Sequence, residues 1–267
     1  MKKILTTPAG RKRYLELLFN HLKNQKNEFD EWILWMNTNV QEDLDYMKKL
    51  SEENEWVKLQ PSKMDQFTSY NIHHFFHESI DENAVYIRLD DDVIYIHPGS
   101  LTKLFDFRIS NPEYFLVYGN ILNNALTSHI HQRRGVLPDN PKLGYMCTDE
   151  NGWNNPHVTE TIHREFFKSY NNDNVDKFFI DNWILNYYER CSINVISWLG
   201  KTFKEFNGHV GNDEEQWLSV DKPSQIQKPN IIFGDGLFIH YAFFTQRNHI
   251  DSTNILQKYK LISEKYI

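Results

Sequence analysis

The 267-residue sequence has few cysteines, no long apolar stretch and no excess of positive charge. Its two cysteines, Cys147 and Cys191, are too few for a disulfide framework or a cysteine zinc cage. No apolar run approaches the roughly 18 residues of a membrane span, and the first residues lack the apolar stretch of a signal peptide. The formal net charge of −7 argues against binding of nucleic acid through bulk positive charge. We therefore expect a soluble, cytoplasmic protein with reduced thiols, no membrane span and no nucleic-acid partner.

Length and composition indicate one globular unit. At about 150 residues per domain, 267 residues correspond to one large domain or two small ones. No internal repeat, low-complexity linker or break in composition divides the sequence, so we expect a single domain over residues 1–267. Aromatic residues make up 15% of the chain, and we expect many of them in the core or at a stacking site.

Strand-like and helix-like patterns alternate over the first 120 residues. The predicted strands are Lys3–Thr7, Trp32–Met36, Val57–Leu59 and Ala84–Leu89, and the predicted helices are Arg11–Gln25, Asp43–Leu50 and Tyr70–Glu78. The strands are short continuous apolar runs, which are typical of buried parallel strands. This alternation predicts the α/β class, with a mainly parallel sheet and helices on both faces.

The second half is less regular. The predicted strands there are Tyr114–Tyr118 and Ile193–Leu199, and the predicted helices are Val158–Ser169, Asp181–Tyr188, Asp213–Leu218 and Ser252–Tyr266. The stretch Thr127–Pro156 contains several glycines, prolines and histidines, and we expect an exposed loop region there. His129 and His131 are then surface histidines.

Three acidic residues, Asp90, Asp91 and Asp92, directly follow the clearest strand. Ligands of open parallel sheets bind outside the carboxyl ends of the strands. In an extended chain Asp90 and Asp92 point to the same side, where they raise each other's pKa unless a cation lies between them. Mn²⁺ or Mg²⁺ suits such oxygen ligands and would also bridge a substrate diphosphate. The plainer alternative is a solvated acidic loop.

Two classes of enzyme use such a triplet. One is the nucleotide-sugar glycosyltransferases of GT-A fold, which carry an Asp-x-Asp motif. The other is the haloacid-dehalogenase-type phosphatases, in which Asp90 would be the nucleophile and Asp92 the acid/base. The phosphatase motif normally lies on the first strand, whereas 89 residues precede it here. The downstream lysine and acidic pair of those phosphatases cannot be placed either.

Further segments extend the comparison along the chain. They are Thr7–Tyr14, Asp30–Trp32, Trp35–Thr38, Tyr86–Asp92, Asn120–Asn124, Asp213–Ser219 and His240–Arg247. This ordered set resembles the GT-A glycosyltransferases of large DNA viruses of algae and of some bacteria, over almost the whole chain. The resemblance implies a metal-dependent, inverting transfer of a sugar from a nucleotide-diphosphate sugar, expected to be a UDP-sugar, to a glycan or protein-linked glycan. It also implies a donor-binding half at 1–120, an acceptor-binding half at 121–267 and, for a viral protein, the host cytoplasm.

The resemblance implies a metal site and a donor site. Asp92 and His240 would hold Mn²⁺ or Mg²⁺, with Asp90 assisting. His240 lies in an apolar run, where a hydrogen-bonded core histidine is the usual alternative. The implied donor-binding residues are Thr7, Pro8, Ala9, Asn37, Arg88, Asp90, Asp91, Asn123 and Asn124.

Several of these donor contacts have a competing structural interpretation. The turn after the first predicted strand would approach the nucleobase, or it is a plain strand-to-helix turn. Arg11 and Arg13 would face the diphosphate, or they are surface charges. Arg88 lies inside a strand, so it is either the partner of a buried acid or a contact to the donor sugar. Asn123 and Asn124 would bind donor-sugar hydroxyls, or they form a turn.

A second acidic cluster lies at Asp213-Glu214-Glu215. Acidic residues at a helix start are stabilised by the helix dipole, and Asp213 is a natural N-cap, which needs no catalytic role. The cluster also resembles the Gly-x-Glu-Asp segment of inverting GT-A enzymes, which implies that Asp213 holds an acceptor hydroxyl and Glu214 is the base. The order of the acids is reversed here, so either acid can be the base.

The acceptor side offers one aromatic candidate, and a non-enzymatic class stays open. Trp153 would stack on an acceptor sugar, or it anchors its loop. A catalytically inactive glycan-binding protein of the same fold is the remaining alternative, against which the two acidic clusters and His240 speak.

Overall fold

The computed structural model describes residues 1–64 and 67–265. The strands are β1 (Lys2–Ala9), β2 (Glu31–Met36), β3 (Val57–Pro61), β4 (Ala84–Leu89), β5 (Val93–Ile96), β6 (Val117–Leu122), β7 (Trp183–Leu185), β8 (Val195–Leu199) and β9 (Asn230–His240). The α-helices are α1 (Lys12–Asn24), α2 (Gln41–Glu53), α3 (Ser100–Ser110), α4 (Ala125–Arg133), α5 (Pro156–Asn171), α6 (Gly200–Lys204), α7 (Glu214–Gln216), α8 (Lys222–Ile226), α9 (Phe244–Asp251) and α10 (Ile255–Glu264). Shorter 3₁₀ and π segments are η1 (Lys26–Glu28), η2 (Ser69–Glu78), η3 (Glu150–Asn154), η4 (Val175–Phe178) and η5 (Trp217–Asp221).

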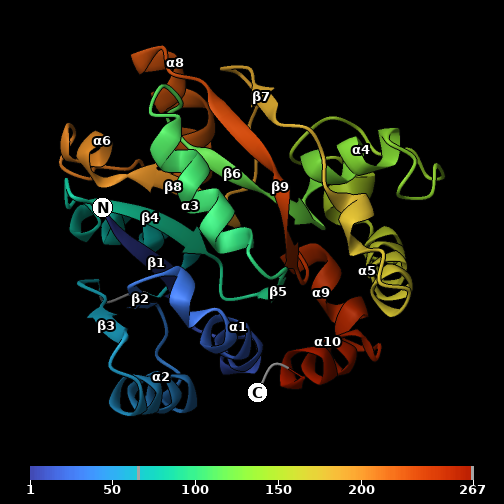
Figure 1. The fold of residues 1–267 in the computed structure, drawn as a ribbon, viewed down its shortest axis with the longest axis horizontal. Helices are drawn as coiled ribbons and strands as arrows, with labels where there is room; N and C mark the ends of the chain where they lie inside the picture. The colour runs from blue at the N-terminus through green and yellow to red at the C-terminus, as the bar shows by residue number, and fades with distance from the viewer. Residues whose placement is uncertain (65–66, 266–267) are drawn as a thin grey trace.

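The strands form one twisted sheet in the order β3-β2-β1-β4-β8-β6-β9-β5, with β7 paired to β9 (Figure 1). The neighbours β3-β2-β1-β4 are all parallel, as are β6 and β9. Strand β8 is antiparallel to both β4 and β6, so β1, β2, β3, β4, β6 and β9 run in one direction, and β5, β7 and β8 run against them. The predicted α/β class and mainly parallel sheet are confirmed.

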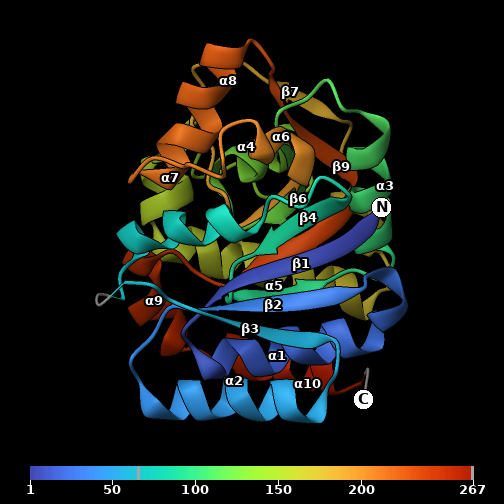
Figure 2. The ribbon, with the colours of Figure 1, turned by 90° about the vertical axis from the view of Figure 1, so that its left-hand side faces the viewer.

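Helices cover both faces of the sheet, as the apolar strands require. Figure 2 shows α1 and α2 on one side of the strands and α6 and α7 on the other. On the first side, Leu15 and Leu18 of α1 pack with Met47 of α2. On the second side, Trp198 of β8 packs with Phe203 of α6. None of the helices in the described part of the chain combines the length and apolarity needed to cross a membrane.

The second half corrects several predictions. The segment Asp181–Tyr188 is not a helix, because β7 within it pairs with β9. The stretch Thr127–Pro156 is not a loop throughout, since it contains most of α4. His131 on that helix is fully buried and donates a hydrogen bond from Nε2 to the carbonyl oxygen of Phe178 at 3.0 Å, so it is not a surface histidine.

Other boundaries shift or were missed. The strand predicted at Tyr114–Tyr118 is β6, which begins at Val117. Helix α3 and strand β5 have no counterpart in the sequence prediction. The last predicted helix corresponds to α10, and Tyr266 lies outside the described residues.

The acidic triplet forms a turn and not an extended strand. Strand β4 ends at Leu89, and the Val93 N–H donates to the Asp90 carbonyl oxygen at 3.0 Å, so the chain reverses into β5. The triplet is therefore not the extended chain that the sequence interpretation assumed. All three carboxylates face the same cleft.

Candidate active site

The carboxyl ends of the parallel strands meet at one edge of the sheet, where a cleft of about 680 Å³ opens. Gly10 follows β1, Asn37 follows β2, Asp90 follows β4, and His240 is the last residue of β9. All four line the cleft. Both its size and its position are typical of a site for a small-molecule ligand in an open α/β sheet.

Asp92 is surrounded by positive charge on the first wall of the cleft. Its Oδ2 lies 3.0 Å from Arg11 Nη1, 3.1 Å from Arg247 Nη2 and 3.5 Å from His240 Nε2. Burial raises the pKa of this carboxyl, but Arg11, His240 and Arg247 outweigh burial and hold the pKa below its usual value. Asp92 is therefore a fixed negative charge.

Asp91 belongs to the same charge cluster. It accepts hydrogen bonds from the Arg11 guanidinium and, at 3.1 Å, from the Gly10 N–H. Arg11 thus spans two carboxylates of the triplet, which places it inside the cleft. Arg13 points elsewhere, because its guanidinium pairs with Asp251 at 2.9 Å.

The ring of His240 is held in one orientation. Its Nδ1 lies 3.0 Å from the Asn123 carbonyl oxygen, which can only accept, so Nδ1 carries the proton. Nε2 lies 3.5 Å from Asp92 Oδ2, and with a proton on Nε2 the ring adds to the positive charge around Asp92. A metal ion that replaced this proton would have the Nε2 lone pair and the carboxylate as ligands, and a carbonyl behind the ring is the usual support of a metal-binding histidine. The residues present therefore fit a divalent ion at Asp92 and His240.

Asn123 and Asn124 lie behind the cleft and do not line it. Asn123 has φ 61°, a left-handed conformation that asparagine tolerates, and its side-chain amide donates to the Tyr241 carbonyl oxygen at 3.1 Å. Asn124 caps α4, and its Nδ2 donates to the Ser192 carbonyl oxygen at 3.1 Å. Both side chains are buried and fully engaged, which corrects the expectation that they bind donor-sugar hydroxyls.

Arg88 connects the two acidic clusters. Its Nη2 lies 2.9 Å from Asp90 Oδ1, and its Nη1 lies 2.9 Å from Glu214 Oε2. The side chain is only 3% exposed, so burial opposes its charge, but the carboxylates of Glu214 and Asp90 raise its pKa above the usual value. Of the two interpretations left open by the sequence, the partner of buried acids is the one that these contacts support. The second oxygen of Asp90 accepts from Asn194 Nδ2 at 3.2 Å.

Glu214 lines the cleft from a separate segment, here called the second wall, and its carboxyl differs from that of Asp92 in the direction of its pKa shift. Its side chain is 12% exposed, and burial raises its pKa to about 7, against the opposing effect of Arg88. A carboxyl group with this pKa can take up a proton near neutral pH. Cys147 Sγ and Arg190 contact the next acid, Glu215.

Asp213 has the position of a helix cap. Its Oδ1 accepts from the Gln216 N–H at 3.1 Å, and its side chain is 53% exposed and paired with Arg190 at 2.9 Å. Burial raises the pKa of Asp213, but the Gln216 N–H and Arg190 outweigh it and hold the pKa below its usual value. The capping interpretation of the cluster therefore fits Asp213, and the unusual pKa belongs to Glu214.

The far end of the cleft contains an unsatisfied acceptor. Asn37 Nδ2 donates to the Thr68 carbonyl oxygen at 3.4 Å, while its buried Oδ1 has no hydrogen-bond partner within the described residues. Of the segment Thr7-Pro8-Ala9, only Pro8 lines the cleft. Thr7 is buried and accepts a hydrogen bond from Trp32 Nε1 at 2.9 Å, and Ala9 is fully buried, so neither side chain can contact a ligand in the cleft.

Aromatic side chains form the rim of the cleft. Trp153 and Phe244 meet edge to face with ring centroids 5.2 Å apart, and Phe243 lies beside Trp153 at 6.2 Å. Phe244 is 71% exposed, which is unusual for so large an apolar side chain. The Trp153 carbonyl oxygen accepts from Gln246 Nε2 at 2.8 Å, which fixes the loop to α9.

The sequence did not identify Arg190, Asn194, Phe243 and Arg247 as residues of this cleft. Arg247 follows His240 by seven residues and is the cation of α9 that reaches Asp92. The sequence did contain one signal for Arg247, since it is a single arginine shortly after the candidate metal ligand His240.

Comparisons with known proteins define the fold. No family model and no curated protein matches the sequence. Among solved structures, CMP:2-keto-3-deoxy-manno-octonic acid synthetase complexed with CTP matches with a TM-score of 0.51 and 8% identity, over 99% of this chain and 100% of that chain. The mannosyltransferase PcManGT from Pyrobaculum calidifontis, in complex with GDP-Man and Mn²⁺, matches with a TM-score of 0.53 and 9% identity over 90% of this chain. The match spans 56% of the mannosyltransferase. The predicted GT-A-like fold is thereby confirmed.

Proposed function

We propose that this protein is a metal-dependent, inverting glycosyltransferase that moves a sugar from a nucleotide-diphosphate sugar to a glycan acceptor. One observation carries the proposal: a single cleft has an oriented carboxylate–imidazole pair on one wall and a buried carboxyl with a pKa of about 7 on the other. A glycosyl transfer needs both, because charge accumulates on the leaving diphosphate while the acceptor hydroxyl loses its proton.

The first wall would bind the donor diphosphate. A divalent ion held by Asp92 and His240 would neutralise charge on the departing nucleoside diphosphate. Arg11 and Arg247 lie beside these ligands and would contact phosphate oxygens directly, a role that suits the fork of a guanidinium group. The mannosyltransferase of similar fold was solved with Mn²⁺, which supports Mn²⁺ here. Asp90 is engaged by Arg88 and Asn194 and would act indirectly, by fixing the turn.

The base of the donor would lie at Asn37. Asn37 lines this end of the cleft, and a side-chain amide both donates and accepts hydrogen bonds, as recognition of a base edge requires. Uracil is the base that we propose, and the donor would then be a UDP-sugar. Pro8 and Gly10 line the same end, and a Cβ added at Gly10 would lie 3.0 Å from the Asn37 carbonyl oxygen, so the chain after β1 packs closely against the chain after β2 here.

The second wall would bind and activate the acceptor. Glu214 would take the proton of the acceptor hydroxyl as the new glycosidic bond forms on the opposite face of the sugar from the leaving group. Trp153 and Phe244 offer exposed aromatic surface at the mouth of the cleft, on which an acceptor sugar would stack. In this proposal residues 1–120 would supply most donor contacts, together with His240 and Arg247, and residues 121–267 would supply the acceptor contacts.

The direct test is hydrolysis of nucleotide sugars in the absence of acceptor, with Mn²⁺ and with chelator. A transferase of this kind slowly hydrolyses its donor in the presence of Mn²⁺. A thermal-shift panel of nucleotide sugars with Mn²⁺ identifies the donor, because a ligand that prefers the folded state raises its stability. Absence of both hydrolysis and thermal shift across the panel would overturn the proposal in favour of an inactive glycan-binding protein.

A sugar nucleotidyltransferase is a second candidate, because the likeness to the CTP-bound synthetase covers both chains almost completely. Such an enzyme releases pyrophosphate from a nucleoside triphosphate and a sugar. A pyrophosphate assay with the four nucleoside triphosphates separates the two. The phosphatase alternative gains no support, because both oxygens of Asp90, its required nucleophile, accept hydrogen bonds from Arg88 and Asn194.

A further inference from the structure

Two histidines and a glutamate converge away from the lining of the cleft. His157 and Glu160 lie three positions apart near the start of α5, and His249 lies near the end of α9. One ligand atom from each of the three side chains lies within 4.8 Å of the others. Helices α5 and α9 pack against each other, so two separate segments of the chain supply this His157–Glu160–His249 cluster.

The side chains of the cluster are already oriented toward one another. His249 Nε2 lies 2.7 Å from Glu160 Oε2, and Arg164 holds the other carboxylate oxygen of Glu160, with its Nε at 2.9 Å. The rings of His157 and His249 meet edge to face with centroids 4.6 Å apart. A carboxylate supported on its far oxygen by a cationic side chain resembles the outer-shell support of metal ligands.

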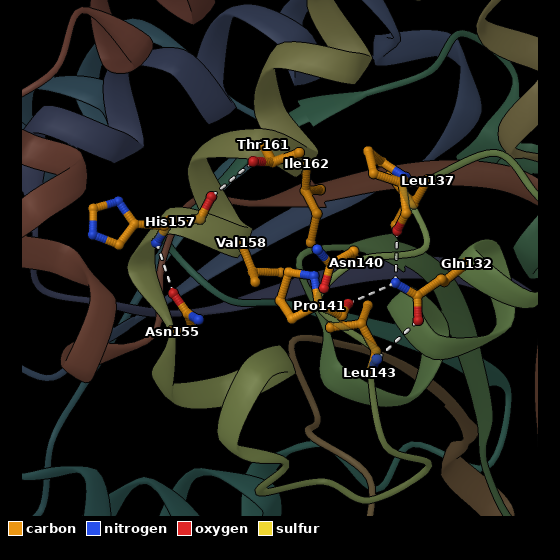
Figure 3. A pocket seen from close by; sticks show the side chains of 11 residues that line it. Gln132, Leu137, Asn140, Pro141, Leu143, Asn155, His157, Val158, Thr161 and Ile162 are labelled. Atoms are coloured by element: carbon orange, nitrogen blue, oxygen red, sulfur yellow. Dashed lines mark hydrogen bonds between the residues drawn. The ribbon is translucent and has the colours of Figure 1, made fainter.

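His157 belongs to the lining of a neighbouring apolar pocket, together with Val158, Ile162 and Pro141. Figure 3 shows its ring on the opposite side of the α5 backbone from Val158 and Ile162. Its backbone N–H donates to Asn155 at 3.1 Å, while no hydrogen bond of the imidazole is found among the described residues. The exposed ring is therefore free to act as a ligand.

We propose that His157, Glu160 and His249 form a second metal site, which binds Zn²⁺ or a similar borderline ion and leaves one coordination position open to water. Two imidazoles and one carboxylate are a ligand set that zinc uses, whereas Mn²⁺ and Mg²⁺ prefer sites with more oxygen ligands. The site would fasten the end of α9 to the start of α5. Helix α9 also carries Arg247, so the second site would stabilise the element that reaches Asp92. The inference does not depend on the proposed function.

The test is a titration with Co²⁺ and Zn²⁺ of chelator-treated protein carrying Asp92→Asn, which removes the cleft site from the measurement. We expect one equivalent of Co²⁺ to bind with an intense visible absorption band of a four-coordinate ion, and Zn²⁺ to displace it. His157→Ala should lower Zn²⁺ affinity by at least about 100-fold, and Arg164→Ala by about 10-fold, as for an outer-shell partner. Because the His157 ring is exposed and makes no described hydrogen bond, its removal should leave the metal-free melting temperature unchanged.

The matched control is His77→Ala, which removes an exposed histidine from a separate group of rings on η2. Zn²⁺ affinity should be unchanged in this variant. The proposal is overturned if no saturable Co²⁺ band forms, or if His157→Ala binds Zn²⁺ as tightly as its parent. Equal losses in His157→Ala and His77→Ala would also overturn it, because they would indicate unspecific binding to histidines.

Discussion

The two acidic clusters of the cleft consist of similar side chains, yet the pKa values of Asp92 and Glu214 shift in opposite directions. Asp92 faces Arg11, Arg247 and His240, and its pKa lies below the usual value. Among the described residues, Glu214 pairs with Arg88, which it shares with Asp90, and burial raises its pKa to about 7. The two pKa values therefore differ because of the surroundings and not because of the residue type: several neighbouring cations outweigh burial at Asp92, and one does not at Glu214. Asp92 is thus suited to binding a cation and Glu214 to accepting a proton.

The largest expected effect follows from removing the fixed charge. Asp92→Asn should abolish metal-dependent turnover, because the amide keeps the shape but removes the anionic ligand. Calorimetric binding of a nucleoside diphosphate should also lose its dependence on Mn²⁺. Glu53→Ala, at an exposed position of α2, is the control and should behave as the parent. Equal nucleotide affinity of the parent protein with Mn²⁺ and with chelator would refute the metal site.

The second largest effect is expected for Glu214, the carboxyl with the raised pKa. Glu214→Gln should lower kcat by about 10²–10⁴-fold, the usual contribution of a general base, while the donor Kd stays within a few-fold of the parent. Steady-state kinetics with the true acceptor and donor titration separate the two quantities. If turnover survives, the base lies elsewhere and a retaining mechanism becomes the better hypothesis. The anomeric configuration of the product, read by NMR, then decides between the two.

The third prediction concerns His240, the histidine beside Asp92. His240→Ala should weaken Mn²⁺ binding in the presence of nucleotide by about 10–100-fold, with a smaller change in melting temperature. Mn²⁺ titration followed by electron paramagnetic resonance measures the first quantity, and thermal unfolding the second. A large loss of stability with unchanged Mn²⁺ affinity would show that His240 is a core residue.

The pH dependence follows from the raised pKa of Glu214. A base must be ionised to act, so kcat should fall by about tenfold per pH unit below an apparent pKa of about 7. This limb should disappear from the residual activity of Glu214→Gln. The raised pKa also makes the free energy of unfolding depend on pH. A carboxyl group whose pKa is higher in the folded than in the unfolded protein contributes stability below its unfolded pKa of 4.5. This contribution is lost as the pH rises through 7. A rate independent of pH between 5 and 8 would contradict the assignment.

The smallest expected effect concerns Asp213. Asp213→Ala removes the cap of the Gln216 N–H and should cost about 1 kcal/mol of unfolding free energy, measured by denaturant titration. Turnover should stay within a few-fold of the parent. A loss of turnover comparable to that of Glu214→Gln would transfer the role of base to Asp213.

Residues that carry chemistry at strand ends could be predicted from the sequence. The triplet after Ala84–Leu89 and His240 at the end of β9 follow from strand patterns combined with the family resemblance, and the structure brings them together. The parallel half of the sheet was predicted for the same reason, since continuous apolar strands leave few alternatives. These signals are local in the sequence.

The contacts that set charge state could not be predicted in this way. Arg88 pairs with Glu214 across 126 positions, and Arg247 reaches Asp92 across 155. Asn123 was expected to bind a sugar hydroxyl through its side chain, yet the contact found at the cleft is that of its backbone carbonyl oxygen with the His240 ring. Such roles depend on which strands become neighbours, and the irregular order of β8, β6 and β9 is not encoded in local patterns.

The sharing of Asp92 between Arg11 and Arg247 has a thermodynamic consequence. In the proposed enzyme, a divalent ion at Asp92 would replace the guanidinium groups that now neutralise the carboxylate, so metal binding would be an exchange of cations. The displaced arginines would then be available to the diphosphate. Linkage requires that the ion raise the affinity for the nucleotide by the same factor by which the nucleotide raises the affinity for the ion. In the proposed enzyme, the cleft would thus fill cooperatively, with each ligand recruiting the other.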